Sequence, residues 1–291
     1  MSVSEAFAKL IDRFQPTSVE LQSAERHASQ IKTRLSQSFT LRKLLVAGSY
    51  ARQTYIHNSS DVDLFAVFAR DDLRKGGHYV SSATALGKLK RELEGRYPST
   101  SVYKDIHAIV VCFSDGSRID VVPLIFQEMT SSNWPLYRMP DGSHDWMGTS
   151  PELHSQYIKN ADEKSRGKLR RTAQIIKFWR ECRTPRVPLS SFHIEMLLAS
   201  FGICEGIKSY AECVTEALQL LAERDCHALR DPLQVCGNIE ATKSILQRDT
   251  TLRSIIHSRS HAKDALYAER HGDIPEAKRQ WNIVFCNQFP R

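Results

Sequence analysis

Hydrophobic positions at the start of the chain recur at helical spacing. One face of the first segment is apolar, at Phe7, Leu10, Ile11 and Phe14. Pro16 interrupts this segment, and Thr17 with Glu20 then gives the capping-box pattern of a new helix start. Apolar residues continue along one face of the second segment as far as Leu35. The pattern predicts two consecutive N-terminal helices, of which the second is long.

The middle of the chain carries short apolar runs that are typical of β-strands. They cover residues 44–48, 62–68, 106–113 and 118–126. A helical stretch around 81–95 lies between the second and third runs, and the Ser-Asp-Gly-Ser segment at 114–117 predicts a hairpin between the last two. Residues 44–126 are therefore expected to form a mixed α/β unit.

The pattern becomes helical near residue 150 and stays helical almost to the end. The joint between the two parts is a segment at 131–151 that contains Trp, Pro, Gly and Ser. We predict an α+β fold with a mixed or antiparallel sheet, a long N-terminal helix and a helical C-terminal half. The expected domains are 1–150, which holds the N-terminal helix and the α/β core, and 151–291, which is helical.

Charge and composition narrow the class of protein. The chain has 291 residues, a formal net charge of +7 and a pI near 9.0. This balance favours an anionic partner, and nucleotides, nucleic acid or simply good solubility would all fit it. No apolar run approaches the length of a membrane span, and the first residues lack the pattern of a secretory signal. We expect a cytoplasmic protein without membrane contact.

The cysteines are odd in number and form no Cys-x-x-Cys pair. They are Cys112, Cys182, Cys204, Cys213, Cys226, Cys236 and Cys286. Buried free thiols in a reducing cytoplasm are the expectation for such a scattered set. The alternative is a zinc site drawn from Cys204, Cys213, Cys226 and Cys236, although structural zinc ligands usually come in close pairs.

Aspartates stand in two of the predicted strands. Asp61 and Asp63 are two residues apart, so their carboxylates should point to the same side of a strand and repel each other. A divalent cation would remove this repulsion, and Mg²⁺ prefers such oxygen ligands. Asp120, in the run 118–126, would complete a two-metal site if the two strands are neighbours. Taken alone, Asp120 is better explained as a strand-edge residue near a turn.

Gly48 and Ser49 directly follow the first apolar run. Glycine lets the backbone approach a phosphate closely, and a serine hydroxyl with backbone N–H groups at a helix start can bind the phosphate oxygens. A Gly-Ser pair is a weak signal by itself. The Asp-x-Asp pair that begins thirteen residues later and the distant Asp120 make the combination specific.

The motifs GSYARQTYIHNSSDVDLF and RIDVVP resemble those of the polymerase-β-like nucleotidyltransferase superfamily. Later segments narrow the resemblance to the bacterial cGAS/DncV-like nucleotidyltransferases, which make cyclic oligonucleotide second messengers. They are WMGTSPELHSQYIKN, LRRTAQIIKFWRE, PLSSFHIEMLL and the tail ALYAERHGDIPEAKRQWNIVFCNQFP. The resemblance spans nearly the whole chain. Cys286 departs from it, because the family commonly has glycine at that place.

The resemblance implies an enzyme that joins nucleoside triphosphates, with ATP expected among them, into a cyclic di- or trinucleotide and releases pyrophosphate. It places this activity in bacterial anti-phage (CBASS-type) signalling. It also implies two Mg²⁺ ions, for which Mn²⁺ can substitute, held by Asp61, Asp63 and Asp120. The helical domain would close the nucleotide cleft.

The resemblance further implies nucleotide contacts outside the aspartates. Lys177 would contact the triphosphate, Ser191 would hydrogen-bond the nucleotide, and Phe192 would stack on its base. Arg52, in the loop after Ser49, and Arg170, seven residues before Lys177, are further candidates for phosphate contact. His193 and Glu195, by contrast, are interpreted as structural residues.

Other functions fit part of the pattern. A CCA-adding or RNA 3′-tailing nucleotidyltransferase would share the aspartates and the basic charge. An inactive nucleotide-binding sensor is a further alternative, although it would have no reason to keep three strand aspartates. A nucleic-acid-binding module lacks a recognition helix or an aromatic-basic motif here, so nucleic acid is not required. We expect a monomer, with a regulatory protein as an additional partner.

Overall fold

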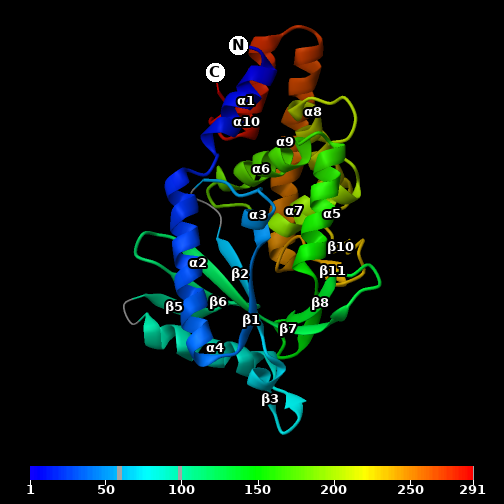
Figure 1. The fold of residues 1–291 in the computed structure, drawn as a ribbon. Coiled ribbons are helices and arrows are strands. Elements are labelled where there is room, and N and C mark those ends of the chain that lie inside the picture. Colours follow the sequence, from blue (N-terminus) through cyan, green and yellow to red (C-terminus); the bar gives the residue numbers. More distant parts are fainter. Residues whose placement is uncertain (58–60, 98–99, 291) are drawn as a thin grey trace.

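The computed structural model describes residues 1–57, 61–97 and 100–290 (Figure 1). The Asn-Ser-Ser segment at 58–60 of the first motif, residues 98–99 and residue 291 lie outside the described residues. One part of the molecule is built on a β-sheet and the other part is a bundle of helices (Figure 1). The predicted α+β class is confirmed.

Two helices open the chain, as the sequence predicts. They are α1 (Val3–Arg13) and α2 (Ser18–Ser38). The Thr17 hydroxyl accepts the N–H of Glu20 at 3.2 Å, and the Glu20 carboxylate accepts the N–H of Thr17 at 2.7 Å. The capping box is therefore present, and it satisfies backbone donors that the first turn of α2 would otherwise leave unpaired.

Over residues 1–57, 61–97 and 100–290, the main sheet has seven strands. They are β1 (Leu41–Ala47), β2 (Val62–Phe68), β5 (Ser101–Lys104), β6 (Ile109–Cys112), β7 (Arg118–Met129), β8 (Pro135–Pro140) and β9 (Trp146–Thr149). The order is β1-β2-β7-β6-β5, while β8 pairs with β7 and β9 pairs with β8. β2 and β7 run parallel and the other neighbours are antiparallel. The predicted mixed sheet and the hairpin between β6 and β7 are confirmed.

Two helices cover one face of this sheet. α4 (Ser82–Arg96) and α2 bury leucines such as Leu35 and Leu89 against Leu64 and Val121 of the central strands. Short elements connect the rest of this part. They are α3 (Gly48–Ala51), the 3-10 turn η1 (Arg70–Leu73), β3 (Arg74–Lys75) and β4 (His78–Tyr79). α2 and α4 cover one face of β2 and β7. Polar residues near the ends of these strands can therefore contact other parts of the molecule only from the opposite face.

The strand pattern differs from the sequence prediction in several places. The segment 131–151, interpreted as a joint, contains β8 and β9, and β5 is also absent from the prediction. β8 begins and ends at proline and β9 contains Gly148, so the local composition does not predict these strands. Pairing with β7 stabilises β8, and pairing with β8 stabilises β9. The run 106–113 is a strand only over 109–112, and β2 begins at Val62, so Asp61 immediately precedes it.

The C-terminal half is helical, as predicted. Its elements are α5 (Pro151–Lys164), α6 (Lys168–Glu181), α7 (Ser191–Ser200), α8 (Tyr210–Glu223), β10 (Leu229–Arg230), β11 (Asn238–Ile239), α9 (Ile245–Arg270) and α10 (Ile274–Val284). The apolar face of α1 packs into this helical core, where the ring of Phe7 lies 5.0 Å from that of Trp281. The first helix therefore belongs physically to the helical half.

All seven cysteines lie in the described part of the chain, and each is a free thiol there. Cys204, Cys213 and Cys226 are buried in the helical half, whereas Cys236 lies apart from them beside His154 and Asp231. No four-cysteine cluster forms among the described residues, but Cys236, one of the four candidates for a zinc site, lies in a group of three potential metal ligands. Among the helices that the structure describes, none combines the length and apolarity of a membrane span.

Candidate active site

Three aspartates meet where the sheet faces the helical half. Asp63 and Asp120 are direct partners in the parallel register of β2 and β7. Asp61 lies two residues before Asp63, and its carboxylate is 3.5 Å from the guanidinium of Arg118. All three line one cavity of about 710 Å³. The structure thus brings together the three residues predicted to hold metal.

Gly48 at the end of β1 makes room for these carboxylates. Its φ of +61° is a backbone conformation that residues with a side chain rarely adopt. A Cβ at this position would lie 1.6 Å from Oδ2 of Asp63. Glycine is therefore required here for two reasons: the backbone turn from β1 into α3, and the close approach of the Asp63 carboxylate.

Burial raises the pKa of the carboxyl groups in this cavity. Burial raises the pKa of Asp63 to about 6, although the positive charge of Arg52 opposes the rise. For Asp120, burial and the neighbouring charges of Asp63 and Asp61 raise the pKa to about 7. The pKa of Asp61 is also raised by burial, with Arg118 opposing. A bound cation would stabilise the ionised form of these neighbouring carboxyl groups, so that all three could carry a negative charge together.

The donor groups fit a hard divalent cation. Oδ1 of Asp120 is buried and has no hydrogen-bond partner within the described part of the chain. An unpaired buried oxygen beside two further carboxylates is a typical ligand environment for Mg²⁺. The three aspartates share the cavity, but their carboxylate oxygens do not all lie within 4.8 Å of one another. Among the described residues, one set of potential metal ligands is that close, namely His154, Asp231 and Cys236.

The cavity also contains two arginines, whose positive charges oppose the raised pKa of Asp61. Arg180 of α6 and Arg186 line it, and each is paired with the Glu181 carboxylate at 2.7 Å. Arg180 also donates to the hydroxyl of Ser191 at 3.0 Å. These arginines are functional candidates that the sequence analysis did not single out. The Lys- and Arg-rich stretch that contains them is the only signal in the sequence, and it does not say which side chains face inward.

Ser49, Ser191 and Phe192, which are predicted to bind the nucleotide, line the cavity. Ser190 caps α7 by accepting the N–H of His193 at 3.3 Å, which fixes Ser191 and Phe192 at the start of the helix. The ring of Phe192 is partly buried and lies 5.3 Å from the guanidinium carbon of Arg52. A flat ring beside a polar cavity suits stacking on a base.

Lys177 occupies a different position from the one expected. Its side chain is fully buried, and Nζ donates to Glu195 at 2.5 Å and to the carbonyl and hydroxyl of Thr54 at 3.0 and 2.9 Å. Burial lowers the pKa of Lys177 to about 8 although Glu195 opposes this. Among the described residues, Lys177 is not one that lines the cavity. Its contact with a triphosphate remains a prediction.

Glu195 connects Lys177 to the cavity. Its buried carboxylate also pairs with Arg52, whose guanidinium lines the cavity. Burial alone would raise the pKa of Glu195, but Arg52 and Lys177 outweigh it and bring the pKa to about 2. Glu195 is interpreted as a structural residue. Its place in this network could not be read from the sequence, because its partners Arg52, Thr54 and Lys177 come from other segments of the chain.

Arg170 lies at a second cavity, of about 700 Å³, which Arg166 and Arg171 also line. Its guanidinium is held by Asp162 and by the side chain of Gln53. In the described structure, the first cavity is lined without Arg170. A direct phosphate contact by Arg170 in the aspartate cavity therefore stays a prediction that this placement does not favour.

Comparison with known proteins identifies the chain as a nucleotidyltransferase. The model of the Second Messenger Oligonucleotide or Dinucleotide Synthetase (SMODS) domain matches residues 1–162. This match covers more than half of the chain, and the chain belongs to that family, the cGAS/DncV-like nucleotidyltransferases.

One curated relative and two solved structures illustrate the likeness. A cyclic AMP-AMP-AMP synthase of Escherichia coli strain MS 115-1 is 24% identical over an alignment of 327 residues, which covers 99% of this chain and 99% of that protein. The structure of E. coli MS115-1 CdnC with ATP has a TM-score of 0.75 at 18% identity, covering 100% of this chain and 99% of that one. CdnC in complex with HORMA-deltaN has a TM-score of 0.73 at 19% identity, covering 99% and 98%.

Proposed function

We propose that this protein is a Mg²⁺-dependent synthase that joins nucleoside triphosphates, ATP among them, into a cyclic di- or trinucleotide and releases pyrophosphate. The observation that carries the proposal is the alignment of Asp63 with Asp120 on adjacent parallel strands, with Asp61 beside them, in one cavity. Membership of the SMODS family and the name of the E. coli relative support the cyclic product.

Asp61, Asp63 and Asp120 would hold two Mg²⁺ ions, or Mn²⁺ in their place. Bound in this cavity, the ions would lower the pKa of an attacking ribose hydroxyl and neutralise charge on the departing pyrophosphate. Gly48 keeps the backbone clear of the Asp63 carboxylate, so this side chain can turn toward the cavity. Because the unpaired oxygen of Asp120 is already buried there, it needs little rearrangement to act as a ligand.

The remaining cavity residues position the nucleotides. Arg180 and Arg186 place positive charge opposite the aspartates, where a triphosphate would lie. Phe192 offers a face for the base, and Ser49 and Ser191 offer hydroxyl donors. In each transfer, a ribose oxygen forms a bond to the α-phosphorus of a second nucleotide, and the bond to pyrophosphate breaks. An intramolecular final transfer would close the ring.

A signalling role follows from the product. We propose that the cyclic nucleotide is a second messenger in bacterial anti-phage defence and that a regulatory protein controls its synthesis. The complex of E. coli CdnC with HORMA-deltaN supports a protein partner for this chain. The chain itself is proposed to act as a cytoplasmic monomer.

The test is product analysis with labelled nucleotides. The purified chain is incubated with Mg²⁺ and labelled ATP, alone and with each other nucleoside triphosphate, then with phosphatase, and products are resolved by chromatography and mass spectrometry. We expect a phosphatase-resistant cyclic product. The Asp61→Asn/Asp63→Asn variant should make at least about 10²-fold less, because the charge of the reacting phosphates is no longer neutralised. Asp71→Asn, an exposed aspartate of η1, is the matched control.

Three other outcomes would contradict the proposal. Extension of an RNA 3′ end without any cyclic product would identify an RNA-tailing enzyme. Nucleotide binding without product in the chain alone and with its copurifying proteins would identify a sensor. Full activity of the Asp61→Asn/Asp63→Asn variant would exclude the aspartates from catalysis.

A further inference from the structure

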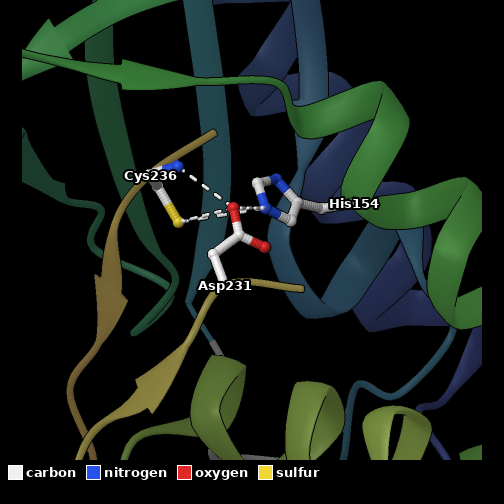
Figure 2. Close-up of side chains that lie close together, drawn as sticks. All are labelled: His154, Asp231 and Cys236. Carbon is white, nitrogen blue, oxygen red and sulfur yellow. Dashed lines mark hydrogen bonds and ion pairs between the residues drawn. The ribbon is translucent and has the colours of Figure 1, made fainter. Parts of the chain in front are cut away.

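A second group of potential metal ligands lies on another wall of the cavity. His154 comes from α5, Asp231 directly follows β10, and Cys236 lies just before β11 (Figure 2). Nε2 of His154 is 3.1 Å from Oδ2 of Asp231, and the Cys236 sulfur is 3.4 Å from the same oxygen and 3.9 Å from the same nitrogen. Three segments of the chain thus direct one nitrogen, one oxygen and one sulfur toward a common point.

Hydrogen positions at His154 leave a place for a cation. Nδ1 lies 2.9 Å from the carbonyl oxygen of Ser150, so this nitrogen must carry a proton and donate it. Nε2 then faces a carboxylate oxygen. Either a second proton or a metal ion must stand between Nε2 and Asp231, because two acceptors do not attract each other. With a metal ion, the imidazole is neutral and Nε2 uses its lone pair.

The ligands are already oriented by their surroundings. The carboxylate of Asp231 accepts backbone N–H groups from Leu233 at 3.0 Å, Val235 at 2.9 Å and Cys236 at 3.0 Å. The bond from His154 to a backbone carbonyl fixes the ring and the tautomer. Outer contacts of this kind, in which a ligand imidazole donates its other N–H and a ligand carboxylate is itself hydrogen-bonded, are typical of metal sites.

The donor set and the spacing select zinc over magnesium. An imidazole, a carboxylate and a thiolate together suit Zn²⁺, whereas Mg²⁺ prefers oxygen alone. In a tetrahedral zinc site, bond lengths of about 2.0–2.3 Å put the ligand atoms roughly 3.3–3.6 Å apart. The three separations of 3.1, 3.4 and 3.9 Å lie within a few tenths of an ångström of that range.

We propose that His154, Asp231 and Cys236 bind a zinc ion separate from the Mg²⁺ ligands, with a fourth position open to the nucleotide cavity. His154 and Cys236 both line the cavity, so water or a ligand atom can reach the fourth position. The ion ties the loop between β10 and β11 to α5. That loop packs closely on the sheet as well, since a Cβ on Gly148 would lie 2.6 Å from the carbonyl of Val235. This proposal does not depend on nucleotidyl transfer.

Metal analysis of the untagged, full-length chain tests the site. The Asp61→Asn/Asp63→Asn background keeps zinc from binding at the aspartates. In that background, we expect about one zinc ion per chain after dialysis, and titration with Co²⁺ should give a thiolate-to-metal charge-transfer band. Cys236→Ala should lose both signals. Cys286→Ala, which removes an exposed thiol, should keep both.

A second measurement needs no substitution. Alkylation of the Cys236 thiol in the wild-type chain, followed by peptide mass spectrometry, should be at least about tenfold slower with zinc than after removal of zinc by a chelator. The proposal is overturned if no zinc remains after dialysis, if Co²⁺ binds without a thiolate band, or if zinc leaves the rate of Cys236 alkylation unchanged. In these cases, His154 and Asp231 form an ordinary ion pair.

Discussion

Individual side chains in the cavity are in a state that favours cation binding. Asp63 and Asp120 have pKa values raised to about 6 and about 7, chiefly by burial, with further contributions from neighbouring charges. Each folded-state value exceeds the usual value of about 4 in an unfolded chain. Without metal, these groups therefore stabilise the fold below pH 4, and this contribution is lost as the pH rises through their folded pKa values.

The Asp120→Asn variant tests this pH dependence. In a chelator, the free energy of unfolding of the wild type should fall relative to that of the variant between pH 5 and pH 8. The relative change should be on the order of 2 kcal/mol, since both proteins ionise Asp63 but only the wild type must also ionise Asp120. Urea denaturation at several pH values measures it. A difference between the two proteins that stays constant with pH would contradict the raised pKa of Asp120.

Lys177 and Glu195 form a buried ion pair, and each depends on the other. Removing the Lys177 ammonium leaves Glu195 with Arg52 as its charged partner and takes a donor away from the buried oxygens of Thr54, which costs about 1–3 kcal/mol. We therefore expect Lys177→Met to lower the free energy of unfolding by that amount, measured by urea denaturation. Lys164→Met, at an exposed lysine near the end of α5, should change it by less than about 0.5 kcal/mol.

A double substitution separates charge from packing at this pair. Lys177→Met with Glu195→Gln should be more stable than the sum of the two single effects predicts, by about 1 kcal/mol or more, because that sum counts the loss of the Lys177–Glu195 attraction twice. Arg52 loses its partner in the Glu195→Gln variant and in the double variant alike, so it does not alter this comparison. Strict additivity would show that Lys177 and Glu195 are not coupled. These two residues also mark a limit of sequence interpretation: a lysine on an apolar helix face is visible, but its distant partner is not.

At the scale of elements, the turn from β1 into α3 determines the geometry of the site. Gly48→Ala would introduce a Cβ that overlaps Asp63, so we expect product formation to fall by about 10²-fold as the carboxylate is displaced. Gly116→Ala is the matched control. Gly116 also has a positive φ, of +84°, but no atom lies within 4 Å of a Cβ there among the described residues.

Both glycine variants should lose about 1–2 kcal/mol of stability from backbone strain, measured by thermal or urea unfolding. Only Gly48→Ala should lose Mg²⁺-dependent product formation. Equal activity of the two variants would show that the space beside Asp63 is not needed, whereas equal inactivation would point to strain as the cause.

Elements with a clear local pattern could be predicted from the sequence, and others could not. The capping box of α2 and the apolar run of β2 lie within a few residues, so α2 is confirmed and β2 spans the predicted 62–68. β8 and β9 carry proline and glycine, and their strand conformation depends on the pairing of β8 with β7 and of β9 with β8. The site shows the same division. The Asp-x-Asp pair is local, but the inward direction of Arg180 depends on how α6 packs.

At the scale of the whole molecule, the cavity lies between the helical core and a small apolar cluster of the sheet, to which Ala108 and Val122 belong. Along the strands this cluster alternates with the larger core that α2 and α4 cover, so the cavity lies on the other face of the sheet. The aspartates come from the sheet, while Arg180, Phe192 and His154 come from the helical half. The periodicity of the sequence indicates both halves. It does not indicate which faces meet, because that depends on contacts between distant segments.

The packing of α1 has a consequence for folding during synthesis. The ring of Phe7 packs edge-on against aromatic rings from the last part of the chain. They are Trp281, Phe285 and Phe289. Because translation starts at the N-terminus, α1 leaves the ribosome long before these rings exist. Phe7 therefore has no aromatic partner until the last part of the chain has been made, so a helix that is synthesised early is fully enclosed late.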